Sequence, residues 1–518
     1  MAEPDHRGGL GRLGAGARPL HADRGRPAIR HAARDERPRG AGELRGAAHR
    51  DARPGTVRLH HALALPAGAG GRAGERAAPG QPDRGGDAAA LARGNTTVSR
   101  PRVVIVGGGF GGLSAARALR RADVDILLID RTNHHLFQPL LYQAATAALA
   151  PSDISAPIRW ILRGQRNVAT RLGTVERIDR AVRTIVLVGV DEPIPYDYLI
   201  LATGSRHAYF GHPEWEEFAP GLKSLDDAQA IRSRFLLALE RAEWEPDPQA
   251  RQALLTFVIV GGGPTGVELA GALPEMGRNA FRRDFRHIDT SRVRVVLVEG
   301  GPRLLASFPE SLSARAQRDL ERLGVEVRTS TIVTGIDAGG VTIGAERIVT
   351  RCVFWAAGNV ASPLGRALGA PVDRAGRVLV EPTLALPGDD RVFVAGDLAA
   401  VPWRDGLLVP GVAPAANQMG TRAARNILAQ LKGRPMQAFR YANKGELATI
   451  GRHAAIASLG GGKVRIAGYP AWLFWLFLHV MYLVGFRNRL SVLLEWGFNY
   501  IFHQRAVRVV SEGRDGLR

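Results

Sequence analysis

The chain has 518 residues, of which 45% are hydrophobic, and a formal net charge of +20. This length gives room for two or three domains with a substantial core. It contains a single cysteine, Cys352, which excludes an intrachain disulfide and every class of enzyme that relays electrons through a cysteine pair. Because Cys352 lies in an apolar run, we expect a buried core thiol.

The first part of the chain has the composition of a disordered segment. Its first hundred residues contain 18 Arg, no Lys and 10 acidic residues, together with many Gly, Ala and Pro. Acids are interspersed and aromatic residues are absent, so we predict no nucleic-acid partner. The segment also lacks the pattern of a secretory signal. We predict a disordered extension over residues 1–97, and our hypothesis is that translation begins near Val98.

A glycine-rich turn follows a purely apolar strand at residues 103–112, VVIVGGGFGG, and opens a helix-forming run. In such a turn Gly107 allows the tight bend, Gly109 lets a pyrophosphate approach the backbone, and Gly112 allows close helix packing. The next predicted strand ends in Asp130, where a carboxylate accepts hydrogen bonds from a ribose, and Arg131 follows it. These features predict a dinucleotide site, although Asp130 could also simply cap its strand.

The same order recurs about 150 residues later at residues 257–266, FVIVGGGPTG. Gly261, Gly263 and Gly266 take the three glycine roles, and Glu299 ends the following strand. A carboxylate at that point repels a 2′-phosphate, so Glu299 favours NADH over NADPH unless it only caps the strand. Two such turns in one chain predict two dinucleotides and electron transfer between them.

Three further short strands decide which dinucleotide lies where. One ends in Thr203 and Gly204, another in Gly358, and the last in Gly396 and Asp397. A terminal Gly-Asp of this kind faces a flavin in two-dinucleotide proteins, whereas the alternative for Asp397 is a helix N-cap. Because it follows the second turn, the first domain is interrupted, with FAD at the first turn and NADH at the second.

The fold class predicted from this order is α/β, with two Rossmann-like domains, the NADH domain being inserted in the FAD domain. The predicted boundaries are 98–250 and 361–435 for the FAD-binding domain, 251–360 for the NADH-binding domain, and 436–518 for a C-terminal helical region.

The C-terminal region has two apolar segments, at residues 471–486 and 490–501. The first is shorter than the roughly 20 residues that cross a bilayer. From residue 434 onward there are 12 Lys or Arg and 4 acids, which would attract an anionic lipid surface. Several aromatic residues are of the types favoured at lipid headgroups: Trp472, Trp475, Tyr482, Trp496 and Tyr500. We interpret the region as a monotopic anchor; a buried hairpin, a dimer interface or a single span are the alternatives.

Several stretches resemble the type II NADH dehydrogenases, which are non-proton-pumping NADH:quinone oxidoreductases of the respiratory chain. The resemblance covers the chain from about residue 99 to its end. Besides the glycine turns and the Trp-rich tail, it is carried by DRTNHHLFQPLLYQ at 130–143, WAAG at 355–358, ASPLG at 361–365, GVAPAANQMG at 411–420 and GELATIG at 445–451. It implies FAD as cofactor, NADH as substrate, a membrane quinone as acceptor, a location at the cytoplasmic face of the inner membrane, and a homodimer.

The resemblance also implies roles for single residues. Glu268 corresponds to a glutamate near the nicotinamide and quinone, although an exposed helical acid is the alternative. Gln418 corresponds to the second glutamine of a quinone-tunnel motif whose first glutamine is replaced by Pro414. Val175 corresponds to a backbone contact with the FAD adenine. His134 and His135 are adjacent and would point apart, so we predict loop packing and no metal site.

The predicted reaction is hydride transfer from NADH to the flavin, followed by two-electron reduction of quinone. The cofactor carries this chemistry, so no Ser-His-Asp or metal constellation is required. Two alternatives stay open: a soluble reductase of the ferredoxin or rubredoxin reductase type, whose tail would pack into the fold, and a flavoprotein whose role is binding or redox sensing.

Overall fold

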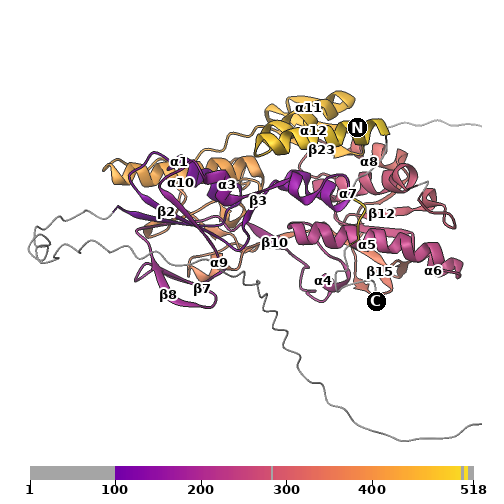
Figure 1. The fold of residues 1–518 in the computed structure, drawn as a ribbon, viewed down its shortest axis with the longest axis horizontal. Helices are drawn as coiled ribbons and strands as arrows, with labels where there is room; N and C mark the ends of the chain where they lie inside the picture. The colour runs from indigo at the N-terminus through magenta and orange to yellow at the C-terminus, as the bar shows by residue number, and fades with distance from the viewer. Residues whose placement is uncertain (1–99, 282–283, 503–506, 511–518) are drawn as a thin grey trace, which may run out of the picture. The chain divides into compact units, whose positions relative to one another are not determined.

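The computed structural model describes residues 100–281, 284–502 and 507–510. The extension predicted at residues 1–97, and the start of translation predicted near Val98, lie outside the described residues. The described chain forms two α/β units and a C-terminal strand and helix region, which we take in turn (Figure 1).

The first unit is built on a six-stranded sheet. Its order is β20 (Ala385–Leu386), β21 (Asp389–Val394), β9 (Tyr198–Leu201), β1 (Arg102–Val106), β2 (Asp125–Asp130) and β5 (Val168–Leu172). β1 pairs in parallel with β2 and β9, with Val103 opposite Ile126 and Tyr198. Val103, Val104 and Ile105 are fully buried, as a parallel strand covered on both faces requires. A three-stranded sheet of β6 (Val175–Asp179), β7 (Thr184–Leu187) and β8 (Val190–Pro195) follows β5.

Two helices cover one face of this sheet at very close range. They are α1 (Phe110–Ala118) and α10 (Ala413–Leu431), which lie side by side in Figure 1. A Cβ on Gly420 of α10 would lie 1.9 Å from the carbonyl oxygen of Gly111 in α1. Only glycine at residue 420 therefore allows this approach, which joins the two parts of the first unit.

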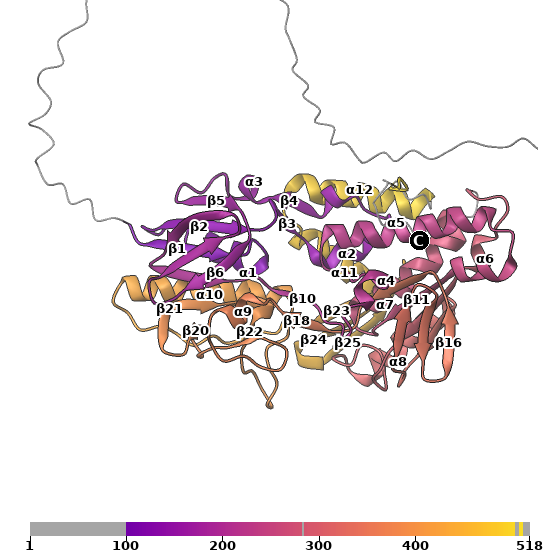
Figure 2. The same cartoon turned by 90° about the horizontal axis from the view of Figure 1, so that it is seen from below.

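The second unit lies between β9 and β21 in the chain, so the first sheet takes strands from both sides of it. Its parallel sheet has the order β13 (Val325–Arg328), β12 (Arg294–Val298), β11 (Thr256–Val260) and β17 (Cys352–Trp355). A hairpin sheet of β14 (Gly335–Asp337), β15 (Gly340–Ile343) and β16 (Glu346–Val349) adjoins it, and its helices include α7 (Pro264–Glu275) and α8 (Glu310–Arg322). Figure 2 shows the connection between the units, formed by β10 (Ser205–His207) paired with β18 (Asn359–Ala361).

One helix ahead of the predicted boundary at residue 251 packs on the second sheet. Phe235 of α5 (Leu225–Trp244) lies with its ring centroid 4.7 Å from that of Phe257 in β11. The Sγ of Cys352 is 3.7 Å from the carbonyl oxygen of Arg234 in the same helix, and Cys352 is fully buried. The boundary predicted at residue 251 falls within α6 (Pro248–Leu254), and both α5 and α6 share the core of the second unit.

The C-terminal region consists of an antiparallel sheet and two helices. The sheet contains β23 (Glu446–Ile450), β24 (Ala454–Leu459) and β25 (Val464–Gly468), and the helices are α11 (Tyr469–Tyr482) and α12 (Phe486–Phe502). Both helices lie at the top of the view in Figure 1. Among the residues that the structure describes, none of the helices combines the length and apolar character needed to span a membrane.

Candidate active site

The first glycine turn, between β1 and α1, leaves space where a pyrophosphate must lie. Gly107 has a φ of +106°, and a Cβ there would lie 2.4 Å from the carbonyl oxygen of Ala202. A Cβ on Gly112 would lie 1.8 Å from the carbonyl oxygen of Gly107, so the helix starts directly against the turn. At Gly109 no atom lies within 4 Å of the Cβ position. The environments of these three positions fit the three tasks of a dinucleotide turn.

The second turn repeats this geometry between β11 and α7. Gly261 has a φ of +113°, and its Cβ position lies 2.5 Å from the backbone nitrogen of Ala357. A Cβ on Gly266 would again lie 1.8 Å from the first glycine's carbonyl oxygen, and Gly263 again faces open space. Gly358, with a φ of +79°, directly follows Ala357. The second turn therefore fits a second dinucleotide.

Each turn is fixed to the acid that ends the neighbouring strand. The Gly108 N–H donates to Asp130 Oδ2 at 2.5 Å, and the Gly262 N–H donates to Glu299 Oε2 at 2.5 Å. The Gly301 N–H donates to the other oxygen of Glu299 at 2.7 Å. A carboxylate has about four lone-pair sites, so both acids keep acceptor capacity for a ribose.

The carboxyl ends of β9 and β21 meet beside the first turn. Thr203 has a buried hydroxyl oxygen with no hydrogen-bond partner in the described chain, and Gly204 has a φ of +67° with open space at its Cβ position. The Ser205 hydroxyl donates to Asp397 Oδ2 at 2.8 Å, and Gly396 adopts a φ of +75°. An orphaned hydroxyl, an open backbone and a fixed carboxylate at this sheet edge fit the ribityl and pyrophosphate groups of FAD.

Two further residues predicted to contact FAD, Val175 and Arg131, lie near Asp130. The Gly173 N–H donates to the carbonyl oxygen of Asp130 at 2.8 Å, and Val175 begins β6 two residues later. Val175 is therefore close to the ribose end of the first turn, where an adenine contact is expected. The side chain of Arg131 is exposed next to it. Both roles stay predictions.

The adjacent histidines point apart, as predicted. His135 is 3% exposed, and its Nδ1 lies 3.0 Å from the carbonyl oxygen of Gly108 in the first turn. Burial lowers the pKa of His135, which keeps it neutral. His134, on the other face of the short strand, is partly exposed. His135 thus supports the glycine turn.

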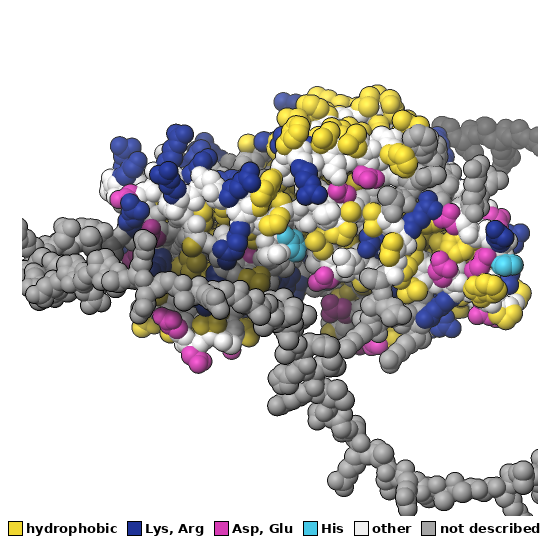
Figure 3. Space-filling view, in the orientation of Figure 1, with side chains coloured by type: hydrophobic (Ala, Val, Ile, Leu, Met, Phe, Trp, Pro, Cys, Tyr) yellow, Lys and Arg dark blue, Asp and Glu magenta, His cyan; other side chains and the backbone are white. Residues whose placement is uncertain are grey.

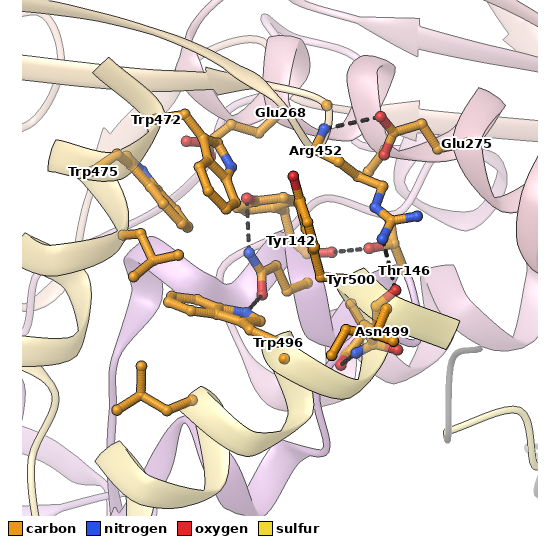
Figure 4. Close-up of a pocket in the computed structure, with 18 of the residues that line it drawn as sticks. Tyr142, Thr146, Glu268, Glu275, Arg452, Trp472, Trp475, Trp496, Asn499 and Tyr500 are labelled. Atoms are coloured by element: carbon orange, nitrogen blue, oxygen red, sulfur yellow. Dashed lines mark hydrogen bonds between the residues drawn. The ribbon is translucent and has the colours of Figure 1, made fainter. Parts of the chain in front are cut away.

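A cavity of about 410 Å³ lies between the second unit and the C-terminal helices (Figure 4). It is lined by residues of α7, α11, α12, the turn after β23 and the short helix α2 (Leu141–Ala145). Aromatic side chains form much of its wall: Tyr142, Tyr469, Trp472, Trp475, Trp496 and Tyr500. Its volume and apolar lining are those of a small-molecule site.

Glu268 lies on α7, and its side chain places a carboxyl group in this cavity. Burial raises the pKa of Glu268 to about 8, although the backbone N–H of Thr449 opposes the shift. A carboxyl group with this pKa is neutral near pH 7 and is able to donate a proton. The alternative of an exposed helical acid does not describe it.

A chain of hydrogen bonds joins residues in the wall of the cavity. The Trp496 Nε1–H donates to Gln143 Oε1 at 2.7 Å, and the Gln143 amide nitrogen donates to the Tyr142 hydroxyl at 2.9 Å. The Tyr142 oxygen also lies 3.0 Å from Thr449 Oγ1. Burial raises the pKa of Tyr142, so its hydroxyl stays protonated. This chain links α12 to the residue whose backbone faces Glu268.

Gln418, predicted from the resemblance to lie in the quinone tunnel, is outside this cavity. The Gln418 amide donates to the carbonyl oxygen of Ala442 at 3.0 Å and accepts from the N–H of Ala442 at 3.0 Å. It is not among the residues that line the cavity. Pro414 lies in the first turn of α10, as its missing N–H allows. The quinone role of Gln418 stays a prediction.

Sequence reasoning assigned no role to several residues that the fold brings to the sites. Tyr142, Gln143 and Thr449 belong to stretches that resemble the family, which was the available signal. The Arg452 N–H donates to Glu275 Oε1 at 2.9 Å at the end of the cavity, next to the turn after β23. Lys223 donates to Ser205 at 2.9 Å, near Asp397.

Comparison with known families defines the class. The family model described as pyridine nucleotide-disulphide oxidoreductase matches residues 101–420, and the model NDH2 C-terminal domain matches residues 443–505. The chain, with its two dinucleotide turns, therefore belongs to the pyridine nucleotide-disulphide oxidoreductase family. It is 46% identical over 428 residues to type II NADH:quinone oxidoreductase NdhA of Mycobacterium tuberculosis, which covers 80% of this chain and 90% of that protein. The chain belongs to the type II NADH:quinone oxidoreductase family.

Other relatives agree. The type II NADH:quinone oxidoreductase of Haemophilus influenzae is 32% identical over 386 residues, covering 69% of this chain and 86% of that protein. NDH2 from Plasmodium falciparum, solved in complex with NADH, has a TM-score of 0.73 at 18% identity, covering 79% of this chain and 99% of that chain. At this identity the likeness shows the fold, which is α/β and of the predicted class.

Proposed function

We propose that the protein oxidises NADH with bound FAD and reduces a membrane quinone without pumping protons. The observation that carries the proposal is the course of α7. This helix starts at the second glycine turn and places Glu268 in a cavity enclosed by the C-terminal aromatic helices. A nucleotide site and an acceptor site therefore share one helix.

The first turn, Thr203, Gly204 and Asp397 would hold FAD, which would supply the two-electron redox chemistry, and the residues of the chain position the reactants. The second turn holds the NADH pyrophosphate, and Glu299 repels a 2′-phosphate. Glu268 holds a proton at its carboxyl group for a quinone oxygen. Each turnover consumes one NADH, one quinone and one proton, and yields NAD⁺ and quinol.

The cavity suits a flat quinone headgroup. Its aromatic walls provide stacking surfaces, and the Tyr142 hydroxyl is held by Gln143 in a fixed direction. Aromatic rings stack with offset or edge contacts. The carboxyl group of Glu268 and the hydroxyl of Tyr142 are then the polar groups that orient the headgroup.

An apolar surface on α11 and α12 supports attachment to one leaflet of a membrane. Figure 3 shows hydrophobic side chains gathered over these helices at the top of the view, with Lys and Arg side chains beside them. The six most exposed Leu, Ile, Met and Phe side chains of the two helices are 47% to 80% exposed: Leu473, Phe477, Met481, Phe486, Leu494 and Ile501. Trp160 of α3 (Ile158–Leu162), 41% exposed, continues this surface, because a Cβ on Gly485 would lie 3.0 Å from its ring. We propose monotopic binding at the cytoplasmic face of the inner membrane.

The tryptophans of the tail do not make this surface. Trp475 is 2% exposed, and Trp472 and Trp496 line the cavity with it. The outward positions carry Leu, Phe and Met instead. The tail thus both packs into the fold and presents an apolar face.

Steady-state NADH oxidation separates the candidate functions. We expect faster turnover with a short-chain quinone than with a one-electron protein acceptor. The reverse preference would favour a soluble reductase of the ferredoxin type, and slow turnover with both would favour a sensor. The proposed homodimer is checked by light scattering of the detergent-solubilised protein.

A further inference from the structure

A second hollow, of about 270 Å³, lies on the exposed side of α10. It is lined by Asn417, Gln418, Thr421, Arg422, Arg425, Phe439 and Arg440. Three of these residues are arginines and none is acidic. This hollow is separate from the aromatic cavity, with which it shares no lining residue.

The chain around the hollow lacks negative charge. Residues 406–445 contain no Asp or Glu. They contain six cations, Arg422, Arg425, Lys432, Arg434, Arg440 and Lys444. A surface of one sign over such a length favours an anionic partner.

The arginines are available to such a partner. Arg422 Nη1 donates to Gln437 Oε1 at 2.7 Å, which holds one guanidinium in place, whereas Arg425 and Arg440 are exposed. In the described part of the chain, none of the three forms an ion pair with a carboxylate. Guanidinium groups match phosphate geometry through paired N–H donors.

A short loop connects the hollow to the end of α11. The paired bonds between Gln418 and Ala442 fasten the following loop to α10. Two residues on, Lys444 Nζ donates to the Tyr482 hydroxyl at 3.2 Å, and Tyr482 is 52% exposed at the end of α11. Four residues of extended chain span at most about 14 Å, so Arg440 lies within that reach of Lys444.

We propose that this hollow binds the phosphate of an anionic phospholipid headgroup when the apolar surface docks on a bilayer. The proposal rests on the membrane attachment proposed above, and it adds a defined anion site outside the C-terminal helices. The volume is below the roughly 300–1,000 Å³ of drug-sized ligand sites, and it suits a headgroup phosphate.

The test measures binding of the FAD-loaded protein to vesicles by sedimentation. Vesicles of phosphatidylcholine alone are compared with vesicles that also contain phosphatidylglycerol. The variant of the hollow, called the groove variant below, combines Arg425→Gln with Arg440→Gln. The control combines Lys432→Gln with Arg434→Gln, which removes equal charge from the same stretch of chain outside the hollow. Retained flavin absorbance shows that each variant is folded.

We expect the groove variant to lose roughly 25-fold in affinity for the anionic vesicles at low salt, since each cation at such a surface contributes roughly fivefold. Its affinity for phosphatidylcholine vesicles should not change, and the control should lose much less. An equal loss in the control, or no loss in the groove variant, overturns the site. If millimolar glycerol phosphate binds to the wild type but not to the groove variant, and leaves the vesicle affinity of the wild type unchanged, the hollow is a site for free phosphate and the lipid proposal is overturned.

The two proposals fail in different ways. Equal binding of the wild type to both vesicle types overturns the anion site alone. Failure of the wild type to bind either vesicle overturns the membrane attachment as well.

Discussion

Replacing Glu268 with glutamine removes a proton donor while keeping the shape of the side chain. At a pKa of about 8, Glu268 is about 90% protonated at pH 7, whereas at the ordinary 4.5 it would be about 0.3% protonated. Burial thus raises the protonated fraction by about 300-fold. If this group donates to the quinone, Glu268→Gln should slow quinone reduction by about 10²–10⁴-fold.

The assay separates the two half-reactions by rapid mixing between pH 5.5 and 9.5. Bleaching of the flavin absorbance by NADH should proceed at an unchanged rate, because hydride transfer needs no acid. The flavin absorbance recovers when the reduced protein is mixed with a short-chain quinone. In the wild type, the rate of this recovery should fall as the pH rises through about 8. The variant should lack this fall, since glutamine does not titrate.

Stability gives an independent check of the same pKa. The unfolded chain ionises this group above pH 4.5, but the folded chain does so only above about 8. As the pH rises between these two values, the free energy of unfolding of the wild type should therefore decline relative to that of Glu268→Gln. The decline should be at most about 5 kcal/mol, and smaller if water enters the cavity. Glu275 supplies a second carboxyl group in the lining of the cavity. The variant Glu275→Gln is therefore the control for the pH profile of quinone reduction. A slowed NADH step with an unchanged quinone step would refute the assignment.

Three further predictions concern the turns and the packing. Glu299→Gln should raise the ratio of kcat/KM for NADPH over NADH by roughly tenfold, because a fixed charge near the 2′-phosphate is removed; an unchanged ratio contradicts its ribose role. Gly420→Ala should lower Tm by several degrees, because its Cβ would meet Gly111 at 1.9 Å, whereas Gly497→Ala on α12, with open space, should not. Burial lowers the pKa of His479 from 6.5 to about 4, so wild-type stability should fall as the pH drops through that range. In His479→Phe the difference in Tm between pH 7.5 and pH 5 should be smaller, and an equal difference would argue against a buried neutral imidazole.

The dinucleotide turns could be predicted because their signal is local. Gly107, Gly109 and Gly112 lie within six residues, and each is required by a contact or an open space inside the same turn. The cavity network could not be predicted in this way. Trp496 donates to Gln143 across 353 residues of sequence, and no local pattern encodes that pairing.

The sequence also could not predict which face of α11 is buried. Composition indicated an apolar helix, but a helix that is apolar on all sides has no stripe that shows which face is buried. In the structure, Trp475 faces inward and Leu473 and Phe477 face outward. The fold decides this, because β24 and the cavity occupy one side of α11.

The course of α7 links the two halves of the proposed reaction physically. The helix is N-capped by Gly263 and carries Glu268 five residues later, which is about 7.5 Å along its axis. Gly266 packs the first turn of α7 directly against Gly261 of the glycine turn. A shift of α7 relative to the pyrophosphate site would therefore also move Glu268. A substitution such as Gly266→Ala should therefore disturb quinone reduction as well as NADH binding. A variant that weakened NADH binding tenfold while leaving the quinone half-reaction and its pH profile intact would show that α7 does not couple the sites.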